Sequence, residues 1–324
     1  MTITIVPFLN IFIHSNWRSG GTYFWSKFRS NPKAYGFYEP LFEGLEAIKP
    51  AAILLDQSAP ALGHVLAAPS KLEYLPLLTD RGVKGFPAGY CYGNYLLSPD
   101  DEAPELLSYL TTLAAFARQH RRFPVFGLVR SSLRIGWFKA EFDGFHIAVR
   151  REPRQRFLSY LKQGAKGDTY FLERDIIIVG RNRDHPALRG LLSLIDLPDF
   201  GRGRGAEKSY RLSIPRLSVP LLYIVFSYLQ KLGQIEAARY ADLIVDLDQL
   251  TRDPQAARRT QSIIADKTGY EIDLSDCVLP RYDDVLDHWR DLYDELDKMV
   301  DTALGQSLRR GAPANDLAIP LQHD

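Results

Sequence analysis

The amino-acid sequence predicts an α/β protein in which helices cover both faces of a mostly parallel sheet. Short apolar runs typical of buried strands alternate with amphipathic helical patterns over the first half of the chain. The composition, with 46% hydrophobic and 24% charged residues, is that of a globular domain. The length of 324 residues permits one or two domains; we predict a single domain over residues 1–324, with a tail of low structure over 312–324.

Hydrophobic periodicity locates the individual elements. We expect strands over residues 8–14, 51–55, 124–130 and 145–149, and helices over residues 22–30, 104–119, 131–140 and 153–163. The helix over 104–119 has the clearest pattern, because Leu106, Leu110 and Leu113 share one face. Residues 176–179 fit either a strand or a buried helical turn. A final amphipathic helix is expected from about Tyr282 to Leu304.

Composition and charge exclude several classes of protein. A net charge of +1 gives no reason to expect binding to nucleic acid or to a membrane surface. Cys91 and Cys277 have no Cys or His at ligand spacing, so we expect neither a metal site nor a disulfide framework. The N-terminus fits a first strand better than a signal peptide, and the longest apolar stretch, Val219–Leu229, is about 11 residues against the ~20 that span a bilayer. We therefore expect a soluble, cytoplasmic protein without a transmembrane segment.

The most informative segment joins the first predicted strand to the first predicted helix. The apolar run Ile11–Ile13 leads into a polar turn, Ser15–Gly21, and Thr22 opens the helix. Such a turn directs backbone N–H groups and the positive end of the helix dipole toward one point, which suits an anion. Gly20 and Gly21 would let the backbone approach a ligand closely, and Arg18 adds a fixed positive charge. The alternative is a glycine-rich turn without a ligand.

The usual nucleotide-binding pattern GxxxxGK[ST] is absent from this turn. The run Arg18-Ser19-Gly20-Gly21-Thr22 instead resembles the 5′-phosphosulfate-binding loop of the sulfotransferases, which follows the first strand in that family. The resemblance implies that these five residues bind 3′-phosphoadenosine 5′-phosphosulfate. It also places Tyr23 where an aromatic side chain packs on adenine, although a core aromatic on the helix face is an equal alternative.

A second motif resembles the 3′-phosphate site of the same family. In sulfotransferases this site uses an Arg at the end of a strand and a Ser eight residues later on the following helix. Arg151 and Ser159 have that spacing, after the predicted strand Phe145–Val149. The alternative is a basic surface turn with a solvated Ser159. Together the two motifs imply a P-loop-like three-layer fold, with residues 165–240 forming a helical and loop region on the acceptor side.

The resemblance also implies catalytic residues. Lys84 corresponds to a lysine that ends the family's second strand near the transferred sulfuryl group, with a solvated strand end as the alternative. Members that sulfate glycans or tyrosines use a Glu shortly after the first helix, and Glu39 has that placement. We expect Glu39 to act as the general base in a partly apolar, aromatic environment that raises its pKa; a cap or surface carboxylate is the alternative. Arg18 would stabilise charge on the bridging oxygen.

These observations lead to an expected function. The protein resembles a metal-independent sulfotransferase that uses 3′-phosphoadenosine 5′-phosphosulfate and a hydroxyl acceptor, with a carbohydrate or glycoconjugate favoured. Two alternatives stay open: a P-loop-type phosphotransferase, and a nucleotide-binding module without turnover. The Gly201–Gly205 loop is expected to be a solvated basic loop or a lid over the anionic cosubstrate.

Overall fold

The computed structural model describes residues 9–56, 66, 68–282 and 289–311 and divides the chain into two compact units. The sheet unit comprises Met1–Arg156 and Gly233–Arg281, and the helical unit comprises Phe157–Leu232 and Tyr282–Asp324. The chain enters the helical unit within α6 (Pro153–Gly164) and returns to the sheet unit within α10 (Val219–Tyr240). One part of the helical unit, Phe157–Leu232, is therefore inserted in the sequence of the sheet unit, and its other part follows that unit.

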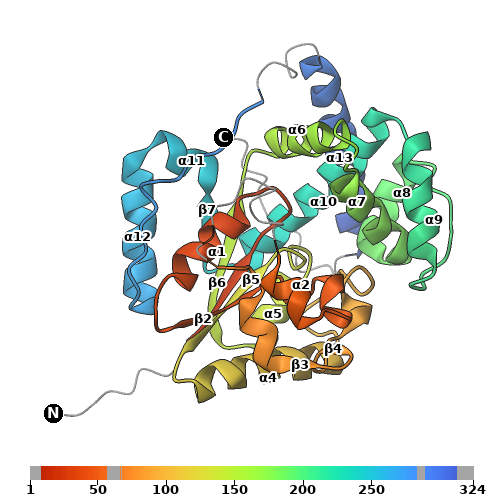
Figure 1. Ribbon diagram of the computed structural model, residues 1–324. Helices are drawn as coiled ribbons and strands as arrows, with labels where there is room; N and C mark the ends of the chain where they lie inside the picture. The colour runs from red at the N-terminus through yellow and green to blue at the C-terminus, as the bar shows by residue number, and fades with distance from the viewer. Residues whose placement is uncertain (1–8, 57–65, 67, 283–288, 312–324) are drawn as a thin grey trace. The chain divides into compact units, whose positions relative to one another are not determined.

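A five-stranded parallel sheet forms the centre of the sheet unit (Figure 1). Its strands are β1 (Asn10–His14), β2 (Ala34–Tyr38), β5 (Phe123–Leu128), β6 (Gly144–Arg150) and β7 (Leu243–Asp246). They lie in the order β2-β5-β1-β6-β7, and each neighbouring pair is parallel. The predicted α/β fold with a mostly parallel sheet is confirmed.

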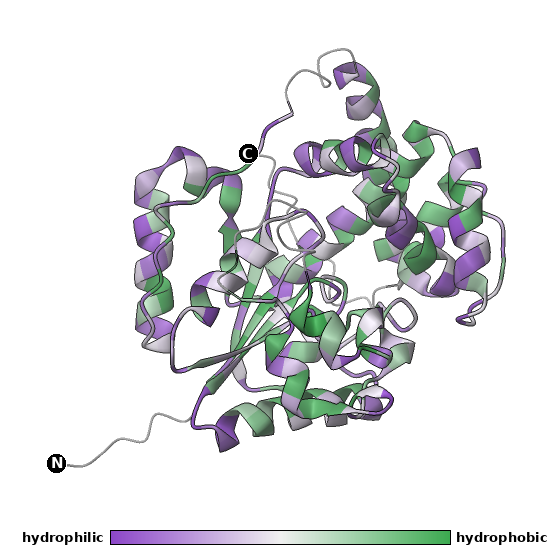
Figure 2. Cartoon of the chain, viewed as in Figure 1, coloured by the Kyte–Doolittle hydropathy of each residue, from purple (hydrophilic) through white to green (hydrophobic). Residues whose placement is uncertain are grey.

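Helices cover both faces of this sheet. Successive strand residues point to opposite faces. Ile11 and Ile13 accordingly pack with α1 (Gly21–Arg29), α11 (Leu247–Arg252) and α12 (Pro254–Thr268). Phe12 packs on the other face with α4 (Pro104–Gln119) and α5 (Ile135–Glu141). Figure 2 shows that the strands between these layers are largely hydrophobic, as burial on both faces requires.

The structure corrects two elements near the start of the chain. Residues 51–55 are not a strand: α2 (Pro50–Leu54) begins with a proline at its first position, which suits a helix. The strand β2 was missed, because Gly36 interrupts a short aromatic run. Gly36 packs closely there, since a Cβ would lie 3.1 Å from the side chains of Trp25 and Arg29, which would have to move. The two short strands β3 (Leu78–Thr79) and β4 (Gly82–Val83) form a separate antiparallel pair.

The helical unit is built from helices. These are α7 (Tyr170–Arg181), α8 (Arg189–Leu194), α9 (Ala206–Ser213) and α13 (Arg290–Gly311), with parts of α6 and α10. Residues 176–179 are thus helical, and the last helix begins after the predicted Tyr282. The predicted tail over 312–324 lies outside the described residues.

Close contacts hold the helices of this unit together. Gly180 on α7 lies against Tyr210 on α9, where a Cβ would lie 2.3 Å from the ring. In the 201–205 loop, Arg202 pairs with Asp184 and Asp199, each at 2.6 Å. No helix among the described residues is long and apolar enough to cross a membrane.

Two buried histidines lie on the Phe12 face of the sheet. His146 Nε2 lies 3.2 Å from the carbonyl oxygen of Phe142, which can only accept, so Nε2 carries the proton. His146 Nδ1 then accepts from His14 Nε2 at 3.1 Å, and His14 Nδ1 accepts from the Ser131 hydroxyl at 2.8 Å. Burial lowers the pKa of His146 to about 4. Burial, followed by the electrostatic effect of His146, lowers the pKa of His14 well below its ordinary value.

This pair predicts an acid-sensitive fold. Both histidines are neutral in the folded protein and take up protons more readily in the unfolded chain. The stability that they contribute is therefore complete above the unfolded-state pKa of 6.5 and is lost as the pH falls from there toward 4. The expected loss of unfolding free energy is about 1.4 kcal/mol per pH unit for each histidine in that range. In urea unfolding across this pH range, the free energy of unfolding of His146→Gln should depend less steeply on pH than that of the wild type. The exposed His120→Gln should behave as wild type; an unchanged slope in His146→Gln would contradict the account.

Candidate functional site

The candidate site lies at the carboxyl edge of the sheet. Because all five strands are parallel, the segments that follow them meet at this edge, where α/β proteins bind ligands. The neighbouring strands β1 and β6 lead to opposite faces. After β1 the chain forms α1 on the Ile11 face, and after β6 it returns through α10, whose Ala237 packs with Ala148 on the other face. The space outside two such strands is the favoured binding position.

The loop between β1 and α1 is built by its own hydrogen bonds. The Ser19 hydroxyl donates to the Asn16 carbonyl at 2.7 Å and accepts from the Asn16 N–H at 3.2 Å. The carbonyl oxygen of Trp17 accepts from Arg156 Nε at 3.1 Å. Arg18 has a φ of 60°, in the left-handed region, and is partly exposed. The buried Ser19 thus shapes the loop, and Arg18 is its solvent-accessible charged residue.

The two glycines of this loop have a structural cause. Gly20 has a φ of 84°, and a Cβ there would lie 2.3 Å from Leu247 Cδ1. A Cβ on Gly21 would lie 2.2 Å from the Ser15 hydroxyl oxygen. Both positions therefore require glycine for close packing of the loop, whether or not a ligand approaches. Gly20 is also the N-cap residue of α1, and it has no side chain that could accept a hydrogen bond from the first N–H groups of the helix.

The beginning of α1 connects to the end of β2 through two hydroxyl groups. The Thr22 hydroxyl lies 2.5 Å from the Tyr38 hydroxyl. Burial and then the negative charge of Glu39 raise the pKa of Tyr38, so its phenol stays protonated. Glu39 follows β2 with a φ of 46° and donates its N–H to the Gly127 carbonyl at 2.8 Å. This left-handed residue turns the chain sharply at the edge of the sheet.

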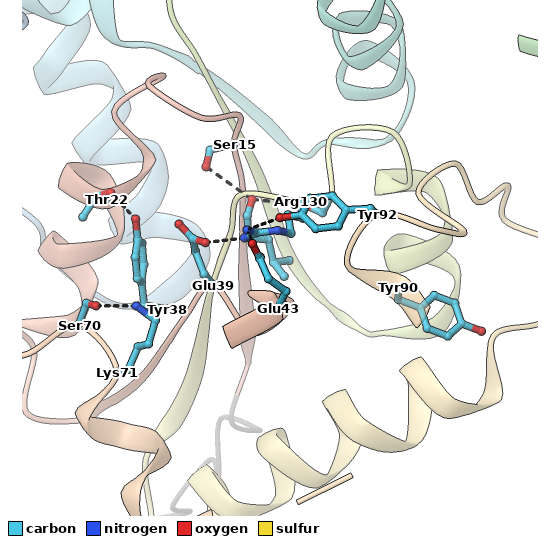
Figure 3. Close-up of polar contacts among 12 residues, drawn as sticks. Ser15, Thr22, Tyr38, Glu39, Glu43, Ser70, Lys71, Tyr90, Tyr92 and Arg130 are labelled. Carbon is cyan, nitrogen blue, oxygen red and sulfur yellow. Dashed lines mark hydrogen bonds and ion pairs between the residues drawn. The ribbon is translucent and has the colours of Figure 1, made fainter. Parts of the chain in front are cut away.

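A buried guanidinium holds the Glu39 carboxylate. Arg130, 1% exposed, donates from Nη1 to Glu39 at 2.5 Å and from Nη2 to Glu43 at 2.7 Å (Figure 3). Its guanidinium carbon lies 5.3 to 5.7 Å from the ring centres of Trp17, Phe42 and Tyr92. The Glu39 side chain is 15% exposed. The expected aromatic environment is present, but it encloses a guanidinium that pairs with the proposed base.

Lys71 is a second cation in this region. It is 9% exposed and lies beside the rings of Phe42, at 4.8 Å, and Tyr38, at 5.9 Å. Its ammonium group lies 3.3 Å from the Ser70 hydroxyl (Figure 3). It also lies 3.7 Å from the Asp56 carboxylate. The predicted cation, Lys84, is instead exposed and follows β4 in the separate antiparallel pair. Its backbone N–H donates to the Leu77 carbonyl oxygen at 2.9 Å.

The residues predicted to bind adenine and the 3′-phosphate lie on α1, in the turn after β6 and on α6. The Tyr23 hydroxyl donates to Asp276 Oδ1 at 2.7 Å, and burial raises the pKa of Tyr23. Arg151, 3% exposed, follows β6 and donates to the Pro280 carbonyl oxygen. Ser159 is buried on α6 and belongs to the helical unit, whereas Arg151 belongs to the sheet unit. Their joint 3′-phosphate site therefore stays a prediction.

Arg130, Glu43 and Lys71 were not predicted from the sequence. Arg130 was recognisable, because it ends the predicted strand over 124–130 and so had to lie at the same edge as Glu39. Glu43 begins a 3-10 helix, and Lys71 precedes another, η2 (Leu72–Leu77). Such short helices have no periodicity that would place their side chains relative to a sheet.

Neither a metal site among the described residues nor a similar protein of known function indicates what this site does. Among the described residues, no group of three or more His, Cys, Asp or Glu side chains is placed to hold a metal ion. Comparisons of the chain with protein-family models, curated proteins and solved structures found no match. The chain's own residues and their geometry are thus the basis for a function.

The Arg130 ion pairs predict a specific stability pattern. Arg130→Met should lower the free energy of unfolding by about 2 kcal/mol, because Glu39 and Glu43 would face each other without their shared cation. Adding Glu39→Gln to Arg130→Met should recover part of that loss by removing the repulsion. Urea denaturation of the wild type, both single variants and the double variant measures the coupling. A double variant less stable than Arg130→Met alone would contradict this explanation.

Proposed function

We propose that this protein is a sulfotransferase that moves a sulfuryl group from 3′-phosphoadenosine 5′-phosphosulfate to a hydroxyl acceptor. The observation that carries the proposal is the place of the Arg18–Thr22 motif: it connects the central strand β1 to the N-terminus of α1 at the carboxyl edge of a parallel sheet. That position supplies backbone N–H groups and a partial positive charge for a phosphate. We also propose that the fold is P-loop-like.

The second phosphate site has related support. Arg151 follows β6, the neighbour of β1, so both basic motifs begin from adjacent strands. Arg156, one turn into α6, binds the Trp17 carbonyl and thus ties the beginning of α6 to the β1–α1 loop. In the proposal Arg18 binds the 5′-phosphosulfate, while Arg151 and Ser159 bind the 3′-phosphate.

Glu39 is the proposed general base. The acceptor O–H gives its proton to the Glu39 carboxylate as its oxygen forms a bond to sulfur. The bond between sulfur and the bridging oxygen breaks, and adenosine 3′,5′-bisphosphate leaves. Arg130 fixes the orientation of the carboxylate through its bond to one carboxylate oxygen, Oε2. Arg18 stabilises the charge on the bridging oxygen, and Lys84 keeps its proposed assisting role.

The proposed acceptor is a carbohydrate or glycoconjugate. A Glu base and aromatic side chains beside it, such as Trp17, Phe42 and Tyr92, suit a ring that carries hydroxyl groups. Residues 165–240, most of which belong to the helical unit, are the proposed acceptor region. A cytoplasmic location is part of the same proposal.

Nucleotide titration tests the donor site. Calorimetry should show selective, magnesium-independent binding of adenosine 3′,5′-bisphosphate over ADP and ATP. Arg18→Ala and Arg151→Ala should each weaken this binding at least about tenfold, because each removes a charge-assisted contact. Arg258→Ala, on the exposed face of α12, is the matched control and should bind as wild type. A preference for ATP with magnesium would favour a phosphotransferase instead.

Glu39→Gln tests the base. Release of adenosine 3′,5′-bisphosphate, measured with a panel of hydroxyl acceptors, should fall at least about 100-fold because the amide cannot take the proton. Nucleotide affinity should stay unchanged. Glu43→Gln is the matched control, since Glu43 binds the same guanidinium without serving as the base, and its turnover should fall less than about tenfold. Full turnover in Glu39→Gln would remove Glu39 from the mechanism.

A further inference from the structure

One irregular segment, residues 273–280, contacts both proposed nucleotide-binding motifs. It follows α12 within the sheet unit and has no helix or strand of its own. Leu274, 1% exposed, and Cys277, 7% exposed, pack in the same core as Phe24 and Phe28 of α1. The segment is therefore anchored by buried side chains to the layer that contains α1.

Asp276 binds two residues one turn apart on α1. Its Oδ1 accepts from the Tyr23 hydroxyl at 2.7 Å, and its Oδ2 accepts from Lys27 Nζ at 2.6 Å. Lys27 Nζ also lies 5.0 Å from the centre of the Tyr23 ring. The Tyr23 ring is thus held at its hydroxyl edge by Asp276 and contacted by the ammonium group of Lys27, which limits its rotation.

The other end of the segment reaches the loop and the second motif. The carbonyl oxygen of Pro280 accepts a hydrogen bond from the guanidinium of Arg151. Leu279 Cδ2 lies 3.7 Å from the position that a Cβ of Gly20 would take. A single stretch of chain thus touches the β1–α1 loop, the first turns of α1 and the residue that follows β6.

We propose that the 273–280 segment is a third element of the nucleotide site and that Asp276 is a positioning residue for Tyr23. This inference rests on the proposed function, because it requires Tyr23 to pack on adenine and Arg151 to bind phosphate. The contacts suit positioning: Asp276 holds the edge of the Tyr23 ring rather than its face. The same segment accepts a hydrogen bond from Arg151 through the Pro280 carbonyl oxygen.

Preorganisation gives the positioning its effect on affinity. A free tyrosine and a free arginine lose rotamer freedom when a ligand binds, and that loss weakens binding. Here the segment has already fixed the Tyr23 ring and one nitrogen of Arg151, and its buried anchors Leu274 and Cys277 keep it in place. Removing the Asp276 contacts should therefore weaken the nucleotide without removing any group that touches it.

Calorimetric titration with adenosine 3′,5′-bisphosphate tests the proposal. Asp276→Ala should weaken binding about fivefold, whereas Asp276→Asn, which keeps an oxygen acceptor for Tyr23, should stay within about twofold of wild type. Tyr23→Phe should weaken binding about threefold, and the double variant Tyr23→Phe/Asp276→Ala should be no weaker than Asp276→Ala. Asp273→Ala, on the same segment, is the matched control and should bind as wild type; the Asp273 carboxylate accepts from the Ser275 N–H at 2.9 Å.

The outcomes separate this inference from the proposed function. Wild-type protein that fails to bind the nucleotide overturns both. If the wild-type protein binds the nucleotide and Asp276→Ala binds it equally or more tightly, the positioning role alone is overturned. Tighter binding by Asp276→Ala would mean that the segment competes with the nucleotide. Additive losses in the double variant also overturn it. If Asp276→Ala does not fold, Tyr23→Phe, which deletes only the hydroxyl, decides: wild-type affinity there overturns the proposal.

Discussion

A buried positive charge organises the carboxyl edge of the sheet. The Arg130 guanidinium is almost inaccessible to water, and a cation in that position needs both compensating charge and hydrogen-bond acceptors. Glu39 and Glu43 supply them, and the rings of Trp17, Phe42 and Tyr92 fill the remaining space. Satisfying this one group places the end of β2, the β1–α1 loop and the beginning of the next 3-10 helix around it. The geometry of the candidate site follows largely from that requirement.

The sequence was sufficient for the architecture where the signal is local and repeated. Apolar runs located β1, β5 and β6, and helical periodicity located α1, α4 and α6, because burial on both sheet faces demands these patterns. It failed at β2, where Gly36 makes room for Trp25, and at residues 51–55, where an apolar run begins with the helix-starting Pro50. Both errors concern segments whose conformation depends on a neighbour or on one proline.

The candidate site was predictable only in part, for a related reason. The β1–α1 loop and Arg151 stand directly beside strong strand signals, and the structure places both at the carboxyl edge. Lys71 and Asp276 come from irregular segments that approach the edge through packing between residues far apart in sequence. Gly20 and Gly21 illustrate a further limit: a ligand-binding loop and a tightly packed loop require glycine equally, and Leu247 and Ser15 supply the packing reason.

The insertion of Phe157–Leu232, one part of the helical unit, between β6 and β7 also constrains how the sheet unit folds. The paired residues Arg150 and Asp246 are 96 positions apart in sequence, whereas most helical contacts are local. Closing so long a segment costs conformational entropy, and this cost arises before the β6–β7 hydrogen bonds that offset it can form. The four strands of the five-stranded sheet that precede the insertion can pair without it, so β7 and the α11–α12 layer are expected to join an already formed sheet. During synthesis on the ribosome, the exposed edge of β6 would therefore stay open until most of the chain has emerged.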